Sequence, residues 1–135
     1  MEDKKSIEKV QRRATKIVSG LYDAPYEERL KILNLPSLYY RRKRGDMIQM
    51  YKICNELVRI EPSKIFSPST YTKTRGHSMK MSKKKASKVP RMNSFSIRAI
   101  NNWNSLPKEV IEAPSLNMFK NRLDMVWDEI QYDIE

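Results

Sequence analysis

The feature that most restricts the fold of this chain is a long helical pattern over residues 37–58. Its apolar side chains recur at three-, four- and seven-residue steps, which places them on one face of an α-helix; they are Tyr40, Met47, Tyr51, Cys54 and Val58. Ser37 directly follows Pro36 and is a favourable N-cap. The opposite face carries Arg41, Gly45, Gln49, Lys52 and Arg59. We therefore expect a helix with a core on one side and a basic face on the other.

Gly45 lies in the middle of this predicted helix, where a glycine costs about 1 kcal/mol relative to alanine. One physical reason for its presence is close packing of a neighbouring helix of the protein. The other is the close approach of a sugar-phosphate backbone, or of another chain, to the arginine-bearing face. The sequence leaves both open.

Five other segments have helical periodicity or helix-boundary residues, namely 5–20, 25–34, 94–105, 107–113 and 115–131, and a single helical turn is expected at 62–66. The first segment carries an apolar stripe that we expect to pack into the core, made of Ile7, Val10, Ala14, Ile17, Val18 and Leu21. Gly20 is placed to end that helix, and Asn34 to end the next one in a left-handed conformation. The sequence thus predicts an all-α fold, a small bundle of five or six helices in one domain over residues 1–135, with a long basic loop at 67–93.

Charge is distributed unevenly along the chain. The net charge is +11, and residues 62–108 contain 11 basic and no acidic side chains. Residues 109–135 contain 2 basic and 7 acidic ones. A balance this basic indicates a polyanion partner. The acidic C-terminal segment could instead fold back on the basic one and neutralise it.

The basic segment has the composition of a nucleic-acid contact surface. Lysine and arginine contact phosphates, and the aromatic residues at its margins, Tyr71 and Phe95, could stack unpaired bases. Because aromatic residues are few, we expect backbone contacts to dominate over base reading. With the basic face of the central helix, the predicted RNA- or DNA-binding residues are Arg41, Arg42, Arg44, Lys52, Lys73, Arg75, Lys80, Lys83, Lys84, Lys85, Lys88, Arg91 and Arg98. The alternative is an exposed loop that only adds solubility or addresses the protein to the nucleus.

The sequence gives little support for a catalytic site or a metal site. The chain has one histidine, His77, and one cysteine, Cys54, which excludes a two-histidine or multi-cysteine zinc site. We expect His77 to contact phosphate or to be solvated, and Cys54 to be a small buried side chain. Asp124 and Asp128, four residues apart, could bind a cation or form a solvated helix face. We predict no catalytic residue, no metal and no cofactor.

The sequence contains no run of 18 apolar residues and no signal-peptide pattern. We therefore predict no membrane partner and an intracellular location, nuclear or cytoplasmic. Met1 followed by a polar stretch fits a free-standing open reading frame left from a degenerate or domesticated element, and a trimmed fragment would look the same.

Several ordered motifs resemble one known family. The pattern RRxRGDxIxxYK at 41–52 is similar to the segment C-terminal to the reverse transcriptase domain in LINE-type (non-LTR, jockey-like) retrotransposon polyproteins. Other stretches agree in the same order: VQRRATK at 10–16, YEERL at 26–30, TRGHS at 74–78, WNSLP at 103–107 and FKxxL at 119–123. The resemblance runs from about residue 7 to residue 127.

The resemblance implies a non-catalytic accessory region that holds template RNA or target DNA near a reverse transcriptase domain. A polymerase of this lineage needs two adjacent metal-binding aspartates, and this chain has no Asp-Asp pair. We therefore expect no polymerase activity from the chain alone; activity would require the missing polymerase in trans. The alternative is a structural module that packs on the polymerase thumb or another partner without nucleic-acid contact. That alternative predicts an exposed apolar patch on the first or last helix.

Overall fold

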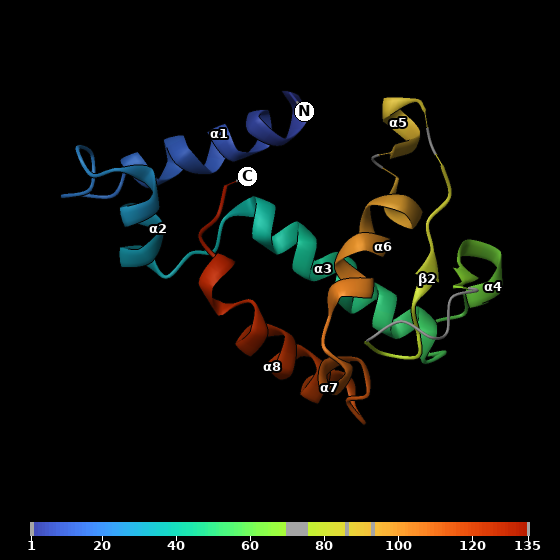
Figure 1. Cartoon of the computed structure of the whole chain (residues 1–135). Helices are drawn as coiled ribbons and strands as arrows, with labels where there is room; N and C mark the ends of the chain where they lie inside the picture. Colours follow the sequence, from blue (N-terminus) through green and yellow to red (C-terminus); the bar gives the residue numbers. More distant parts are fainter. Residues whose placement is uncertain (1, 70–75, 86, 93, 135) are drawn as a thin grey trace. The chain divides into compact units, whose positions relative to one another are not determined.

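A computed structural model describes residues 2–69, 76–85, 87–92 and 94–134 (Figure 1). The protein is mostly helical, as the sequence predicts. The helices are α1 (Glu2–Lys16), α2 (Tyr26–Leu33), α3 (Leu38–Cys54), α4 (Pro62–Ile65), α5 (Val89–Met92), α6 (Phe95–Ser105), α7 (Lys108–Ile111) and α8 (Leu116–Val126), with a 3-10 helix, η1 (Asp128–Ile130). Two short antiparallel strands, β1 (Ser67–Pro68) and β2 (Met81–Ser82), pair Ser67 with Ser82 and Pro68 with Met81.

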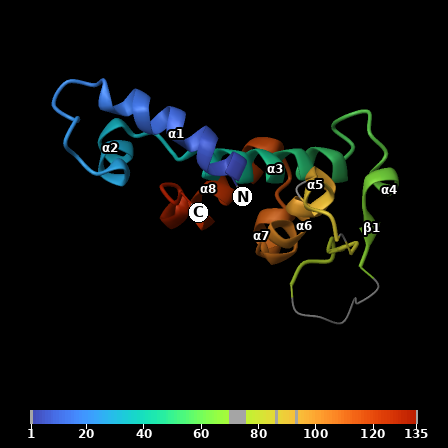
Figure 2. The ribbon, with the colours of Figure 1, turned by 90° about the horizontal axis from the view of Figure 1, so that it is seen from above.

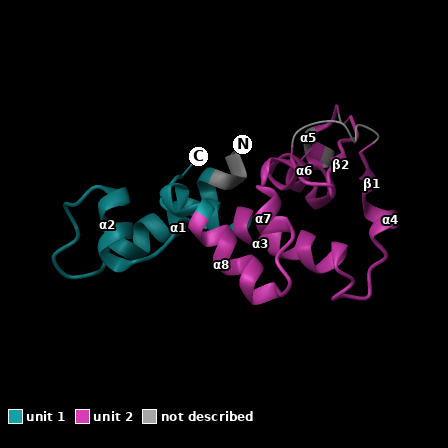
Figure 3. Ribbon diagram, turned by 60° about the horizontal axis from the view of Figure 1, so that its bottom comes forward, with its two compact units in different colours: residues 1–42, 126–135 teal, residues 43–125 magenta. Residues whose placement is uncertain are grey.

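The chain divides into two compact units (Figure 3). Unit 1 comprises residues 1–42 and 126–135, and unit 2 comprises residues 43–125. Unit 1 has a small core around Tyr26 and Leu30. Unit 2 has a larger core that includes Met47, Trp103 and Phe119. Whether the two units fold as one domain stays a prediction.

Three helices end earlier than the periodicity predicts; the last of them, expected to reach residue 131, ends as α8 at Val126 and is followed by η1. Instead of reaching residue 20, α1 ends at Lys16, and Gly20, with a φ of 82°, lies in the turn that follows. Instead of reaching residue 58, α3 ends at Cys54, because Glu56 adopts a left-handed φ of 55°. The Leu57 amide then donates to the Lys52 carbonyl at 2.8 Å, the 6→1 bond of a Schellman cap. Glutamate is uncommon in this conformation, so the sequence does not indicate that the helix ends here.

The two predicted cap residues behave as expected. Asn34 ends α2 with a φ of 51°, and the following amide, that of Leu35, donates to the Leu30 carbonyl at 2.9 Å. Ser37 caps α3, since its Oγ accepts the Tyr40 amide at 3.1 Å. The two remaining amides of that first turn, of Leu38 and Tyr39, donate to the Glu8 carboxylate at 3.3 and 3.2 Å.

The predicted packing of α1 is wrong. Its apolar side chains Ile7, Val10 and Ile17 are 55%, 67% and 86% exposed. The side chains that α1 buries in unit 1 are polar, namely Glu8 and Thr15. Glu8 caps α3 and also accepts the Tyr26 hydroxyl, while Thr15 accepts Nε of Arg29. The hydrogen bonds of Glu8 and Thr15 therefore determine which face of this helix is buried, and a hydrophobic pattern cannot predict them.

Arg29 of α2 is buried and joins the two N-terminal helices. Its guanidinium donates to Thr15 Oγ1 at 3.1 Å, to the Arg12 carbonyl at 3.2 Å and to the Ala24 carbonyl. The Tyr26 ring lies 5.5 Å from its Cζ. The Arg12 carbonyl lies near the C-terminal end of α1, where the helix dipole is negative and favours a cation. No carboxylate pairs with Arg29 in the part of the chain that the structure describes.

In unit 2, the apolar face of α3 packs on α6 and α8, as its periodicity predicts. Met47 and Tyr51 are buried, and the Tyr51 ring stacks on Phe119 with centroids 4.4 Å apart. The Tyr51 hydroxyl donates to the Ala113 carbonyl at 2.5 Å. Two ion pairs flank this contact: Asp46 with Arg98 of α6, and Arg44 with Asp124 of α8. Figures 1 and 2 show α6 beside this part of α3.

Candidate nucleic-acid interface

The predicted basic loop contains ordered anchors where it is described. The backbone of Met81 in β2 makes two hydrogen bonds to the Asn104 side chain of α6, each 2.8 Å long. Lys80 lies just before β2, and its carbonyl accepts the Ser69 amide at 2.9 Å. The helical turn α5 also falls inside the predicted loop. The three lysines at 83–85 therefore directly follow a strand that is hydrogen-bonded to α6.

His77 is one of these anchors, and the expectation that it contacts phosphate or is solvated is wrong. The side chain is buried, and its Nδ1 accepts the Met79 amide at 3.2 Å. The ring proton must then lie on Nε2, which donates to the Trp103 carbonyl at 2.9 Å. Burial, followed by the positive charge of Lys80, lowers the pKa of His77. His77 is a neutral structural residue at physiological pH.

Trp103 completes the anchor from the side of α6. Its indole Nε1 donates to the Met79 carbonyl at 2.9 Å, and its ring meets the His77 ring edge-on at 6.0 Å. The segment 77–81 thus makes four side-chain hydrogen bonds with Trp103 and Asn104. The WNSLP motif at 103–107 supplies both residues, so that motif positions the basic segment.

Four predicted contact residues, Lys83, Lys84, Lys85 and Lys88, are exposed on the segment that follows this anchor. Within residues 2–69, 76–85, 87–92 and 94–134, no carboxylate lies within ion-pair distance of them. Of the acidic C-terminal segment, Asp124 pairs with Arg44 and Glu112 with Lys108. Within the described part of unit 2, the neutralisation that the charge pattern left open is therefore not found for these four lysines.

Two predicted contact arginines are occupied by internal carboxylates. Arg98 forms a two-pronged pair with Asp46, with both N···O distances 2.8 Å, and this hydrogen bonding raises the pKa of Arg98. Arg44 forms the same kind of pair with Asp124 at 2.6 and 2.8 Å. Such a pair uses the donor fork that would bind a phosphate. These two arginines join helices, and the solvated-face interpretation of Asp124 is wrong.

The remaining predicted residues fall into three groups. Arg41 is exposed, and Arg42, Lys52 and Lys80 are partly exposed. The backbone of Arg91 belongs to α5, but its side chain lies outside the described part. Lys73 and Arg75, together with Tyr71, fall outside the described residues. Sequence reasoning missed Asn104, whose role as an anchor had no signal beyond its place in the WNSLP motif.

Gly45 is exposed, and the space around it is open. A Cβ at this position would meet no heavy atom within 4 Å among the described residues, apart from the local helix backbone. Packing of a neighbouring helix in the described part of unit 2 therefore does not explain the glycine.

We expect Gly45→Ala to stabilise the protein by about 0.5–1 kcal/mol, because alanine loses less backbone entropy in a helix. Urea denaturation followed by circular dichroism measures this change. Gln49→Ala, one turn along the same helix, is the control and should change stability by only a few tenths of a kcal/mol, roughly the propensity difference. A destabilised Gly45→Ala would show that the site is crowded.

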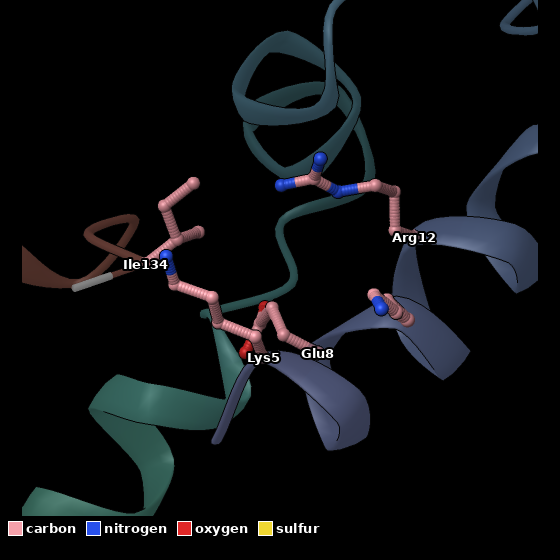
Figure 4. A pocket seen from close by; sticks show the side chains of 5 residues that line it. Lys5, Glu8, Arg12 and Ile134 are labelled. Carbon is pink, nitrogen blue, oxygen red and sulfur yellow. The ribbon is translucent and has the colours of Figure 1, made fainter. Parts of the chain in front are cut away.

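A basic hollow with a volume of about 280 Å³ lies in unit 1. It is lined by Lys5, Glu8, Lys9, Arg12 and Ile134 (Figure 4). In Figure 4 the Lys5 side chain extends toward Ile134. The Glu8 carboxylate already accepts the α3 amides, and the Arg12 guanidinium lies 4.8 Å from the Tyr26 ring. Two of the four charged groups of this hollow, those of Glu8 and Arg12, thus already make contacts within unit 1.

The remaining polar side chains include the thiol of Cys54. Burial raises the pKa of the Cys54 thiol to about 11, so the thiol stays protonated at neutral pH and is a poor nucleophile. In the described part of the chain, no three metal-ligating side chains gather. No helix there is long and apolar enough to cross a membrane.

No family model, curated protein or solved structure matches this chain. The resemblance to LINE-type polyproteins therefore stays a prediction.

Proposed function

We propose that this protein binds nucleic acid through phosphate contacts made by Lys83, Lys84, Lys85 and Lys88. One observation carries the proposal: the four side chains are exposed, have no carboxylate partner among the described residues, and follow a segment anchored to α6. Lysine contacts a phosphate as a point charge, which holds the polymer without reading its sequence. The binding free energy then comes mainly from release of counterions, so affinity depends strongly on salt.

The LINE-type resemblance gives this activity a setting. A region of that kind would hold template RNA or target DNA beside a reverse transcriptase domain and would perform no chemistry itself. The motif residues His77, Trp103 and Asn104 support the proposal indirectly, since they fix the backbone from which the lysines project. In this proposal the motifs build the scaffold, and the lysines beside them make the contacts.

The test is a titration of fluorescent single-stranded RNA and duplex DNA at several salt concentrations. Changing all four lysines to glutamine should reduce the slope of log affinity against log salt by about 3 for the single strand, since each phosphate contact contributes about 0.7. Affinity at low salt should fall about a hundredfold or more by the same mechanism.

The matched control changes four exposed lysines elsewhere, Lys9, Lys16, Lys31 and Lys108, to glutamine. Both variants lose the same net charge. We expect the control to keep most of the parental salt slope. An equal loss in both variants would mean that only net charge attracts the polymer, and no loss in the first variant would refute the proposal.

A second candidate function, protein interaction without nucleic acid, is favoured by the apolar face of α1. The exposure of Ile7, Val10 and Ile17 is the feature that this alternative predicts on the first helix. The flanking side chains Lys5, Lys9 and Arg13 would suit a partner helix with an apolar strip between acidic residues. In the same titration, this alternative predicts weak RNA binding that does not change with salt or with the four-lysine variant.

A further inference from the structure

Beside the lysine segment, unit 2 contains a hollow of about 280 Å³ lined by α4, the two strands and the start of α6. Two lysines, Lys64 and Lys84, and four serines, Ser67, Ser82, Ser94 and Ser96, contribute to its lining. None of the described lining residues carries a carboxylate. Lys84 also belongs to the proposed phosphate-contacting set, so the hollow opens on the same surface.

The polar lining has the chemistry of a phosphate site. Ammonium groups supply charge, and hydroxyl groups supply adaptable donors, two common kinds of phosphate contact in nucleic-acid complexes. The amino end of α6, at Phe95, adds a positive helix dipole, and its first turn contains no acidic residue. Glu61 lies 3.4 Å from Lys64, but both side chains are mostly exposed, and a phosphate can compete with so weak a pair.

The other side of the hollow is apolar. Ile97 and Ile100 of α6 are buried beneath it, and Ile65 of α4 lines it as well. Ile65 is the partly exposed one of the three, and the ribose or base attached to a phosphate can bury its apolar area, which a phosphate alone cannot do. The volume is slightly below the range of roughly 300–1,000 Å³ that is typical of small-molecule pockets, which suits one nucleotide and not a duplex.

We infer that this hollow binds one nucleotide unit of a single strand, with its phosphate at Lys84 and the serines and its sugar or base against Ile65. The inference rests on the proposed function and deepens it, since it predicts a preference for single-stranded over duplex nucleic acid. None of the described residues that line the hollow is aromatic, so these residues offer no base stacking, and they are expected to confer little base selectivity.

The test compares Ser96→Glu with Ser87→Glu. Ser96 lines the hollow, whereas Ser87 is an exposed residue among the lysines that does not line it. Both changes add one negative charge near the basic segment. A glutamate in the first turn of α6 also suits the helix dipole, so the fold is expected to persist, which circular dichroism checks.

We expect Ser96→Glu to weaken binding of a fluorescent single-stranded 12-nucleotide RNA at least tenfold. Ser87→Glu should weaken this binding less than threefold. The two variants should bind a duplex of the same sequence with equal affinity. Adenosine monophosphate should compete for the single strand better than inorganic phosphate does. Equal effects of the two variants on the single strand, or equal competition by inorganic phosphate, would overturn the nucleotide site. The four-lysine variant tests the proposed function independently. A reduced dependence of its affinity on salt would support that function even without the nucleotide site, and an unchanged dependence would refute it.

Discussion

Replacing Phe119 with alanine is expected to remove about 3–5 kcal/mol of stability, the usual cost of deleting a large aromatic side chain from a core. Phe119 is fully buried, its ring stacks on Tyr51 at 4.4 Å, and it lies 6.2 Å from the Trp103 ring. Small domains are stable by about 5–15 kcal/mol, so the loss would be a large fraction of the total. Urea denaturation monitored by tryptophan fluorescence measures it.

The control for this prediction is Met125→Ala on the same helix. Met125 is 80% exposed, and its truncation should change stability by about 0.5 kcal/mol or less. Both variants are measured in a protein that also carries Trp127→Phe. Trp103 is then the one remaining tryptophan, and its fluorescence reports on the unit 2 core. If Phe119→Ala and Met125→Ala have the same small effect, the packing of α8 on α3 is wrong.

Replacing Arg29 with methionine is expected to cost about 3 kcal/mol, because it leaves the buried Thr15 hydroxyl and the partly buried Arg12 and Ala24 carbonyls without their donor. Methionine retains most of the side-chain volume, so the loss reports the hydrogen bonds more than a cavity. Arg29→Lys should recover little of the stability, since an ammonium cannot reproduce the planar fork that reaches three acceptors. Thermal unfolding of the three proteins gives the comparison.

Arg13→Met is the matched control for Arg29, since Arg13 lies on α1 and is exposed. It removes the same charge from unit 1 and should change stability by about 0.5 kcal/mol or less. Full recovery by lysine at position 29 would contradict the prediction, because charge alone would then be sufficient.

Both predictions concern residues of the motifs on which the proposed LINE-type resemblance rests. Arg29 belongs to YEERL, and Phe119 to FKxxL. Residues of three of these motifs hold elements together: Arg29 joins α2 to α1, Asp46 joins α3 to α6, and Trp103 holds the segment that precedes the lysines. The proposed binding residues lie outside these motifs, in the lysine run that the motifs position.

The amino-acid sequence by itself determined the helical class, the buried face of α3 and the caps at Asn34 and Ser37. These features follow from local rules: apolar side chains at helical spacing, a side chain able to accept the first amides, and a residue tolerant of left-handed φ. It also determined the charge asymmetry, since composition needs no coordinates.

Only the tertiary structure decided which charged and polar groups are used up inside the protein. Arg44 and Arg98 look the same as Lys84 in a charge count, yet each arginine meets a carboxylate from a distant helix, Asp124 or Asp46. His77 became a core residue because Trp103 and Met79 supply partners for both ring nitrogens. The apolar stripe of α1 stayed exposed because Glu8 and Thr15 found hydrogen-bond partners on the opposite side. Pairings of this kind join residues far apart in the chain, and a periodicity, which is local, cannot contain them.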